Sequence, residues 1–259
     1  MRRIFFILIP VLFAGTLVIG CANDDKALPD ESSLTAPAVS TAKSVPDFPA
    51  DPGDFVAEID NPYLGFERGR TFTYEGETDE GIETIVVEVT HETKTILGVA
   101  TTVVHDQAYL DGELVEDTFD WFAQDADGNV WYFGEDSKEI EGGVVVSTEG
   151  SWEAGVDGAM PGVLMLAEPV VGVSYQQEFA EDVAEDMARV LSLIRTAEVP
   201  HGTFDECLMT QEWSHLEPGA REFKYYAPGV GLVLELSPSG GRDRVELVSV
   251  EDEVDTVGR

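Results

Sequence analysis

Apolar and polar residues alternate along most of the chain from Asp54 onward. In the run Thr84–Glu92, the β-branched residues Ile85, Val87 and Val89 fall on one side, and mostly acidic or hydroxyl-bearing residues fall on the other. A period of two with β-branched residues is typical of half-buried β-strands. The same pattern predicts further strands at 71–74, 99–110, 113–125, 130–135, 144–149, 173–179, 188–199, 204–216, 221–226, 232–237 and 242–250.

Short turn motifs separate these segments, among them Asp111-Gly112, Asp127-Gly128 and Gly142-Gly143. Consecutive strands joined by tight turns pair in antiparallel fashion, and a long flat sheet would expose its edges. We therefore predict an all-β fold, an antiparallel meander of about eleven or twelve strands that forms a barrel or a barrel-like sandwich. Residues 152–169 interrupt the alternation with three glycines and two prolines, which predicts either a flap over one end of the barrel or a cap beneath its core.

Two of the turns define a register for the strands beside them. A two-residue turn at Asp111-Gly112 or at Asp127-Gly128 fixes which residues face each other across the hairpin. The predicted facing pairs are Tyr109 with Leu114, Val104 with Phe119, Asp106 with Asp117, Phe122 with Phe133, and Gln124 with Trp131.

The N-terminus has the pattern of an export signal. Arg2 and Arg3 precede the uncharged segment Ile4–Ile19, which as a helix spans about 24 Å and falls short of the ~30 Å needed to cross a bilayer. The four residues Val18-Ile19-Gly20-Cys21 resemble the lipobox of bacterial lipoproteins. That resemblance implies cleavage before Cys21 and acylation of its thiol. An ordinary secretory signal followed by a chance cysteine is the alternative.

These features divide the chain into three parts: a lipoprotein signal peptide at 1–20, a disordered tether rich in proline, serine and acidic residues at 21–53, and a single β domain at 54–259. The lipoprotein resemblance implies a location outside the cytoplasm, with attachment to the membrane through the acylated Cys21. In an envelope with two membranes, Ala22 is compatible by the same resemblance with sorting to the outer membrane.

The chain is strongly acidic. Removal of residues 1–20 leaves 13 basic and 51 acidic residues, a net charge of −38. Such a charge argues against nucleic acid as a partner and against electrostatic binding to an anionic membrane. It is compatible with cation binding, with a salty habitat, or with solubility alone.

Aromatic residues are concentrated in the two central hairpins. The side chains of Phe119, Trp121, Phe122, Trp131 and Phe133 either form a packed wall of the core or line a cavity for a hydrophobic ligand.

Three sets of polar residues could carry chemistry. Asp106 and Asp117, facing each other near His105, could perform acid–base catalysis as in a hydrolase or isomerase, or could be the solvated end of two strands. His91 and His105 could meet across a hairpin and bind zinc or copper.

The third set surrounds the turn at Asp127-Gly128. Asp125, Asp127 and Asn129 have alternating oxygen ligands that suit calcium, although Asp-Gly is also the commonest chemistry of a hairpin turn. No cofactor other than calcium is indicated. The sequence contains no Gly-x-Ser-x-Gly motif and no phosphate-binding glycine loop.

Near the C-terminus, Glu222–Val233 resembles the closing hairpin of secreted, lipocalin-like bacterial β-proteins, which implies a fold type rather than an activity. The sequence thus predicts a lipid-anchored extracytoplasmic protein that binds a hydrophobic small molecule or lipid. The alternatives are an enzyme that uses Asp106, Asp117 and His105 at the mouth of the barrel, and a structural or surface-interaction lipoprotein without a cavity.

Overall fold

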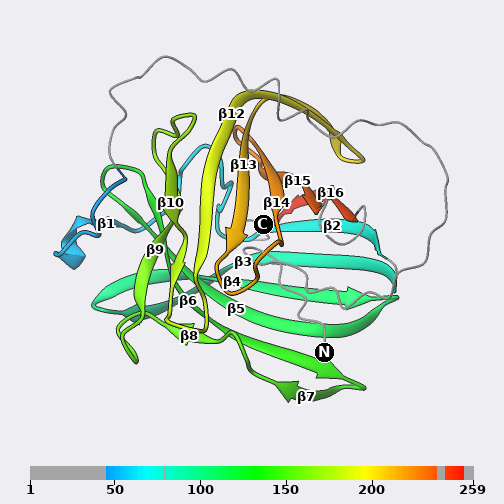
Figure 1. The fold of residues 1–259 in the computed structure, drawn as a ribbon, viewed down its shortest axis with the longest axis horizontal. Coiled ribbons are helices and arrows are strands. Elements are labelled where there is room, and N and C mark those ends of the chain that lie inside the picture. The colour runs from blue at the N-terminus through cyan, green and yellow to red at the C-terminus, as the bar shows by residue number, and fades with distance from the viewer. Residues whose placement is uncertain (1–44, 79, 238–242, 254–259) are drawn as a thin grey trace, which may run out of the picture.

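The computed structural model describes residues 45–78, 80–237 and 243–253, and within them it is built almost entirely of β-strands (Figure 1). The predicted signal peptide, Cys21 and most of the predicted tether lie outside the described residues. The strands are β1 (Phe55–Val56), β2 (Arg70–Thr78), β3 (Gly81–Ile96), β4 (Val99–Leu110), β5 (Glu113–Asp125), β6 (Val130–Glu141), β7 (Val144–Ser147), β8 (Trp152–Glu153), β9 (Met160–Met165), β10 (Ser174–Gln176), β11 (Glu178–Phe179), β12 (Asp186–Val199), β13 (Gly202–Ser214), β14 (Glu222–Ala227), β15 (Gly231–Ser237) and β16 (Asp243–Asp252). A 3₁₀ turn at Pro52–Asp54 precedes β1. In this part of the chain, no helix has the length and apolar content that crossing a bilayer requires.

Thirteen of these strands follow one another in a single antiparallel sheet that curls into a nearly closed barrel. Their order is β10-β12-β13-β14-β15-β16-β2-β3-β4-β5-β6-β9-β11, with β1 paired to β5 and with β7 and β8 paired to β6. The two ends of this order, β10 and β11, are consecutive in the chain, so the segment that joins them brings the edges of the sheet together. In Figure 1, β2 to β6 form one curved wall, and β12 to β14 cross it at a steep angle. The predicted antiparallel barrel is confirmed.

The predicted flap contains strands. Within residues 152–169, β8 and β9 both pair with β6, and Gly162 faces Tyr132. A Cβ at Gly162 would lie 2.2 Å from the backbone oxygen of Gln177, so glycine permits the close approach of the segment that closes the barrel. The alternation was hidden because glycines and a proline occupy positions where strands usually carry side chains.

We expect Gly162→Ala to destabilise the barrel by about 1–3 kcal/mol, because the new methyl group must push β9 away from residue 177. Urea unfolding measures the change. Gly202→Ala is the matched control, since a Cβ there would approach nothing closer than 3.8 Å. Equal stability of both variants would contradict the close approach.

The register of the hairpin β4–β5 differs in part from the prediction. Tyr109 faces Leu114 as expected, but a β-bulge between Ala108 and Tyr109 shifts the pairs beyond it by one residue. Asp106 therefore faces Thr118 rather than Asp117, and Val104 faces Asp120 rather than Phe119. A bulge leaves no signal in the alternation, which is why the sequence did not reveal it.

The hairpin β5–β6 is also shifted. The Asp125 amide donates to the Asn129 carbonyl oxygen at 2.9 Å, so the turn is longer than the predicted two residues. Phe122 faces Tyr132 rather than Phe133, and Gln124 faces Val130 rather than Trp131.

The interior of the barrel is divided along its axis into two layers. The first end of the barrel has the turns at Leu97-Gly98 and at residues 126–128, and the second end has the turns at Asp111-Gly112 and Gly142-Gly143. Near the first end, the interior is filled by apolar side chains, including Val89, Val104, Phe122, Leu208, Val233 and Leu247. Near the second end, the same inward positions of the same strands carry carboxyl groups.

The segment before β1 lies against the barrel. The ring of Phe48 makes edge contacts with Trp131 at 5.2 Å and with Phe133 at 5.8 Å between ring centroids. Phe55 also packs against Phe48 and Phe133. Residues 45–53, which the sequence placed at the end of the tether, are thus partly in contact with the core.

Candidate functional site

The acidic half of the interior, which we call the acidic layer, contains ten buried carboxyl groups among the residues that the structure describes. Their side chains occupy strand positions that point into the barrel, and each residue is at most 8% exposed. They are Glu83, Asp106, Glu116, Asp120, Glu135, Glu178, Asp186, Glu212, Glu222 and Glu235. Buried carboxyl groups are rare in proteins unless they are paired, so ten of them in one layer make this layer the candidate functional site.

One wall of the acidic layer holds a single ammonium group. Lys224 on β14 is fully buried, and its Nζ lies 3.1 Å from Glu212, 3.5 Å from Glu222 and 3.8 Å from Glu235. These carboxylates raise the pKa of Lys224 above its usual value even though burial alone would lower it. Glu212 also accepts hydrogen bonds from the hydroxyl groups of Thr210 and Tyr226.

The opposite wall, formed by β4, β5, β6 and β11, has carboxyl oxygens without partners among the described residues. They are Oδ2 of Asp106, Oδ2 of Asp120, Oε1 of Glu135 and both side-chain oxygens of Glu178. Tyr132 donates its hydroxyl hydrogen to Oδ1 of Asp120 at 2.6 Å. The indole of Trp152 lies close enough to Glu178 to lower its pKa, but its N–H does not reach hydrogen-bond geometry. An unpartnered buried carboxyl group is costly, and such groups commonly mark a place for an ion, a ligand or shared protons.

Burial raises the pKa of these groups into or above the neutral range. Loss of hydration is the main cause in every case; it raises the pKa of Asp120 to about 7, against the opposing hydrogen bond from Tyr132. The pKa of Glu116 rises to about 8, where Thr118 donates a hydrogen bond that limits the shift. The pKa of Asp186 rises to about 7, held down by Ser214 and by the charge of Lys224. Burial also raises the pKa values of Glu135 and Glu178. The charge of Glu178 adds to the rise at Glu135, and the charges of Asp186 and Asp120 add to the rise at Glu178. The unliganded acidic layer is therefore largely protonated at neutral pH on this wall.

The acidic layer is not arranged as a metal centre. Within the described residues, no three histidine, cysteine or acidic side chains converge in a way that could hold a metal ion. Carboxyl groups spread over several strands instead suit a ligand with several hydrogen-bond donors or a positive charge.

Two of the three residues predicted as calcium ligands, Asp125 and Asn129, have side-chain oxygens that accept hydrogen bonds from the protein. Asp125 accepts hydrogen bonds from the amides of Asp127 and Asn129, from Nδ2 of Asn129, and from Nε1 of Trp131 at 2.8 Å. Asn129 in turn accepts from the Ala167 amide. These contacts are those of an Asx turn that closes the hairpin. A cavity of about 190 Å³ next to this turn is lined mainly by apolar residues of the 166–173 loop and by Val45 and Pro46.

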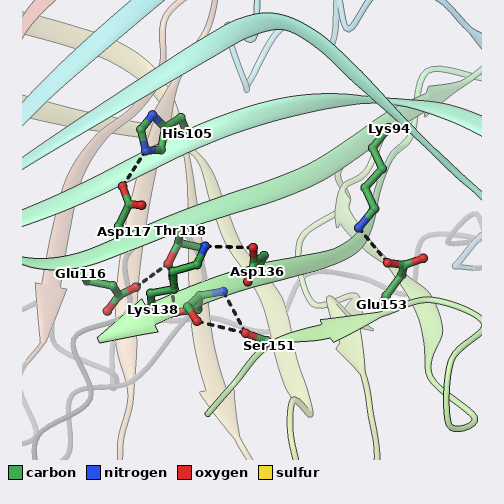
Figure 2. A network of polar contacts seen from close by, with 10 residues as sticks. Lys94, His105, Glu116, Asp117, Thr118, Asp136, Lys138, Ser151 and Glu153 are labelled. Atoms are coloured by element: carbon green, nitrogen blue, oxygen red, sulfur yellow. Dashed lines mark hydrogen bonds and ion pairs between the residues drawn. The ribbon is translucent and has the colours of Figure 1, made fainter. Parts of the chain in front are cut away.

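Two of the three predicted catalytic residues meet, and the third does not. His105 on β4 and Asp117 on β5 point toward each other, with Nε2 and Oδ1 separated by 2.7 Å (Figure 2). Gln107 also donates to Asp117, and the His105 ring stacks on Phe119 at 4.2 Å. Asp106 belongs to the acidic layer, on the other face of the sheet, because neighbouring residues of a strand point in opposite directions. The predicted constellation of three is therefore wrong, while the histidine–aspartate pair exists.

Other polar contacts surround this pair on the same sheet. Figure 2 shows Lys138 beside Asp136, at 2.9 Å, and Lys94 beside Glu153, at 2.7 Å. His91 does not meet His105, since Glu88 faces His105, and the Nε2 of His91 lies 2.9 Å from Glu253. The two histidines are apart because the turn at Leu97-Gly98 pairs Ile96 with Val99, whereas the pairing of His91 with His105 required a turn centred on Gly98.

The five aromatic residues predicted to line a cavity are divided between the two faces of the sheet. Phe122 points inward and stacks on Tyr132 at 4.7 Å. Phe119 stacks on His105, and Trp121 lies beneath the Lys94 ammonium group, 3.2 Å from the ring centroid.

Trp131 and Phe133 are covered by Phe48, as described above. The five rings therefore do not form the wall of one common cavity.

Comparisons with known proteins give a likeness in fold. No model of a protein family and no curated protein sequence matches the chain. Among solved structures, a Bacteroides fragilis protein assigned as exported, with a YmcC-like fold, aligns with a TM-score of 0.44 and 12% identity over 73% of this chain and 99% of its own. A Parabacteroides distasonis protein assigned as a lipoprotein aligns with a TM-score of 0.41 and 11% identity over 74% of this chain and 99% of its own.

Proposed function

We propose that this protein is a lipid-anchored binding protein outside the cytoplasm, whose acidic layer binds a small organic molecule with a primary ammonium group. The unpartnered carboxyl oxygens of Asp120, Glu135 and Glu178 support this proposal more than any other observation. The location and the anchor at Cys21 rest on the lipobox-like sequence.

The molecule itself contains a precedent for ammonium binding by this layer. On one wall, the ammonium group of Lys224 is held by three glutamates within 3.8 Å. On the facing wall, Asp120 and Glu178 raise the pKa of Glu135, and the charge of Lys224 reaches this group at Glu178, whose pKa it lowers. Oxygens of all three carboxyl groups still lack a hydrogen-bond partner among the described residues. A ligand ammonium group there would form ion pairs with these carboxylates, as Lys224 does with the three glutamates on its side.

The chemistry of the site changes the kind of ligand that the sequence suggested. A purely hydrophobic ligand would leave the buried carboxyl oxygens without partners, at a cost of about 1–3 kcal/mol for each group. Apolar contact remains available at Phe122 and Tyr132, which adjoin the acidic layer. The ligand we propose therefore has a short apolar body and an ammonium head. The acidic layer adjoins the second end of the barrel, which is the entry route that we propose for the ligand.

An enzyme at the barrel mouth has less support than a binding protein. Its three residues lie on two faces of the sheet, and His105 and Asp117 together lack a nucleophile at hydrogen-bond distance among the described residues.

Calorimetric titration with 1,5-diaminopentane and n-butylamine tests the proposal. We expect both amines to bind, and n-butanol and butyrate not to bind. Glu178→Gln keeps the shape of the side chain but removes a charge, and it should weaken amine binding about tenfold or more. Binding should strengthen between about pH 6 and pH 8.5, because the carboxyl groups must lose protons before they can pair with an ammonium group.

Glu88→Gln is the matched control, since Glu88 is exposed on the outer face of β3. If the amines fail to bind at any pH in this range, or if the two variants lose affinity equally, the proposed site is wrong. Tighter binding of butanol than of butylamine would instead support a hydrophobic ligand.

A further inference from the structure

The hairpin β6–β7 presents an unpaired strand edge with apolar side chains. β7 pairs only with β6 in the described part of the chain, through Ile140 with Val145 and Glu141 with Val144. The three consecutive valines 144, 145 and 146 are 64%, 49% and 51% exposed. Figure 1 shows β7 at the lower margin of the molecule, beyond the curved wall to which β6 belongs.

The turn geometry determines which backbone groups of β7 are open. Gly142 and Gly143 both have positive φ, 58° and 78°, as in a type I′ turn of two residues. The residues that flank such a turn, Glu141 and Val144, form a hydrogen-bonded pair, so the N–H and C=O of Val145 point away from β6. The open edge thus offers one donor and one acceptor in the plane of the sheet.

The side chains of the three valines are largely outside the core of the barrel. Successive side chains of a strand point to opposite faces, so three exposed valines in a row mean that both faces of β7 are open to solvent. The β4–β5 hairpin, which ends at the same end of the barrel, instead has the polar turn Asp111-Gly112 between Leu110 and Glu113. Exposed edges are normally protected by charge, proline, a short strand or a bulge. β7 has only four residues and a register shift against β6, but no charge and no proline, so its apolar edge is suited to pairing with a short strand.

We propose that β7 accepts an extended segment of a partner protein, which adds as a further strand and carries apolar residues flanked by basic ones. Strand addition uses the open backbone groups for affinity and the valine side chains for specificity. Charge favours a basic partner over a second copy of this chain. Glu139 and Glu141 flank the edge, and the whole chain has a net charge of −36, so two copies would repel each other.

A titration with synthetic peptides tests this interaction. The protein is residues 21–259 with Cys21→Ser, and the probe is a blocked six-residue peptide with alternating valine and threonine between two lysines. We expect saturable binding with a dissociation constant below about 1 mM, and slower amide hydrogen exchange at Val145. Val145→Pro removes the outward N–H without touching the bonds to β6, and it should weaken binding about tenfold or more. Val145→Thr retains the N–H and the strand propensity, and its affinity should stay within about twofold.

Four results would overturn the proposal. The first is the absence of binding by the lysine-flanked peptide, and the second is equal binding of a peptide with glutamates in place of the lysines. The third is a concentration-dependent dimer of the protein that Val145→Pro abolishes, which would assign the edge to a second copy. The fourth is peptide binding that Val145→Pro leaves unchanged, which would place the peptide elsewhere.

Discussion

Raising the pH from about 5 to about 9 is expected to lower the free energy of unfolding of the unliganded barrel by several kcal/mol. The cause is the acidic layer, where burial raises the pKa of Asp120 and Asp186 to about 7 and that of Glu116 to about 8. In the unfolded chain these groups ionise near their ordinary values of 3.8 and 4.5.

The sign follows from the proton count. Between the unfolded and the folded pKa, the unfolded chain has lost protons that the folded chain still holds. Unfolding therefore releases protons, and each such carboxyl lowers the stability by about 1.4 kcal/mol per pH unit. The stability is fully present below about pH 4, falls as the pH rises, and stops falling near pH 7 to 8 for these three groups. Because the groups interact, their contributions are less than additive.

Urea unfolding at about pH 5, 7 and 9 measures this effect. Asp120→Asn and Glu116→Gln should each reduce the pH dependence, because an amide has no proton to lose. Repulsion among surface carboxylates is screened by salt and buried groups are screened much less, so the trend should persist in about 0.5 M sodium chloride. A stability that stays constant or rises over this range would contradict the burial of ionisable carboxyls.

The pH dependence and the proposed ligand are linked through the same protons. An ammonium group that enters the acidic layer favours the ionised carboxylates, so it should displace protons and stabilise the fold most at high pH. The unliganded protein would then be most stable where it binds amine most weakly.

Much of the fold was predictable from the sequence because it depends on local rules. Alternation of apolar residues located most of the long strands, and glycine-containing turns separated them. The details that failed depend on non-local geometry. The bulge at Ala108–Tyr109 and the longer turn at 125–129 shift the register by one residue, and no residue pattern marks either of them.

The acidic layer was missed although the sequence holds a signal for it. Glu83 is in phase with Ile85 and Val87, and Asp120 is in phase with Phe122, so both acids share the inward side of their strands. Acidic residues near strand ends are usually solvated, and a solvated strand end was one of the two interpretations that the sequence offered for Asp106 and Asp117. Only the closure of the sheet, which depends on contacts between distant strands, shows that ten such residues face one interior.

Replacing Lys224 by methionine is expected to have the largest effect of any single substitution, a loss of about 3–5 kcal/mol at pH 8. Lys224 is fully buried, and its charge lowers the pKa values of Glu178, Asp186 and Glu222. Without the ammonium group, the glutamates around it must either take up protons or remain as unpaired buried charges. Both alternatives are unfavourable at high pH, and protonation becomes easy at low pH, so the loss should shrink toward pH 5.

Urea unfolding of Lys224→Met at both pH values measures this loss, and Lys138→Met serves as the control. Lys138 pairs with the half-exposed Asp136 on the outer face, where an ion pair contributes at most about 1 kcal/mol. If Lys224→Met does not fold at pH 8, the double variant with Glu222→Gln should recover part of the stability, because it removes one of the carboxylates left without a cation. A Lys224→Met protein as stable as the Lys138→Met control at pH 8 would show that the carboxyls around residue 224 are already neutral, and that the ammonium group is not what holds their charge.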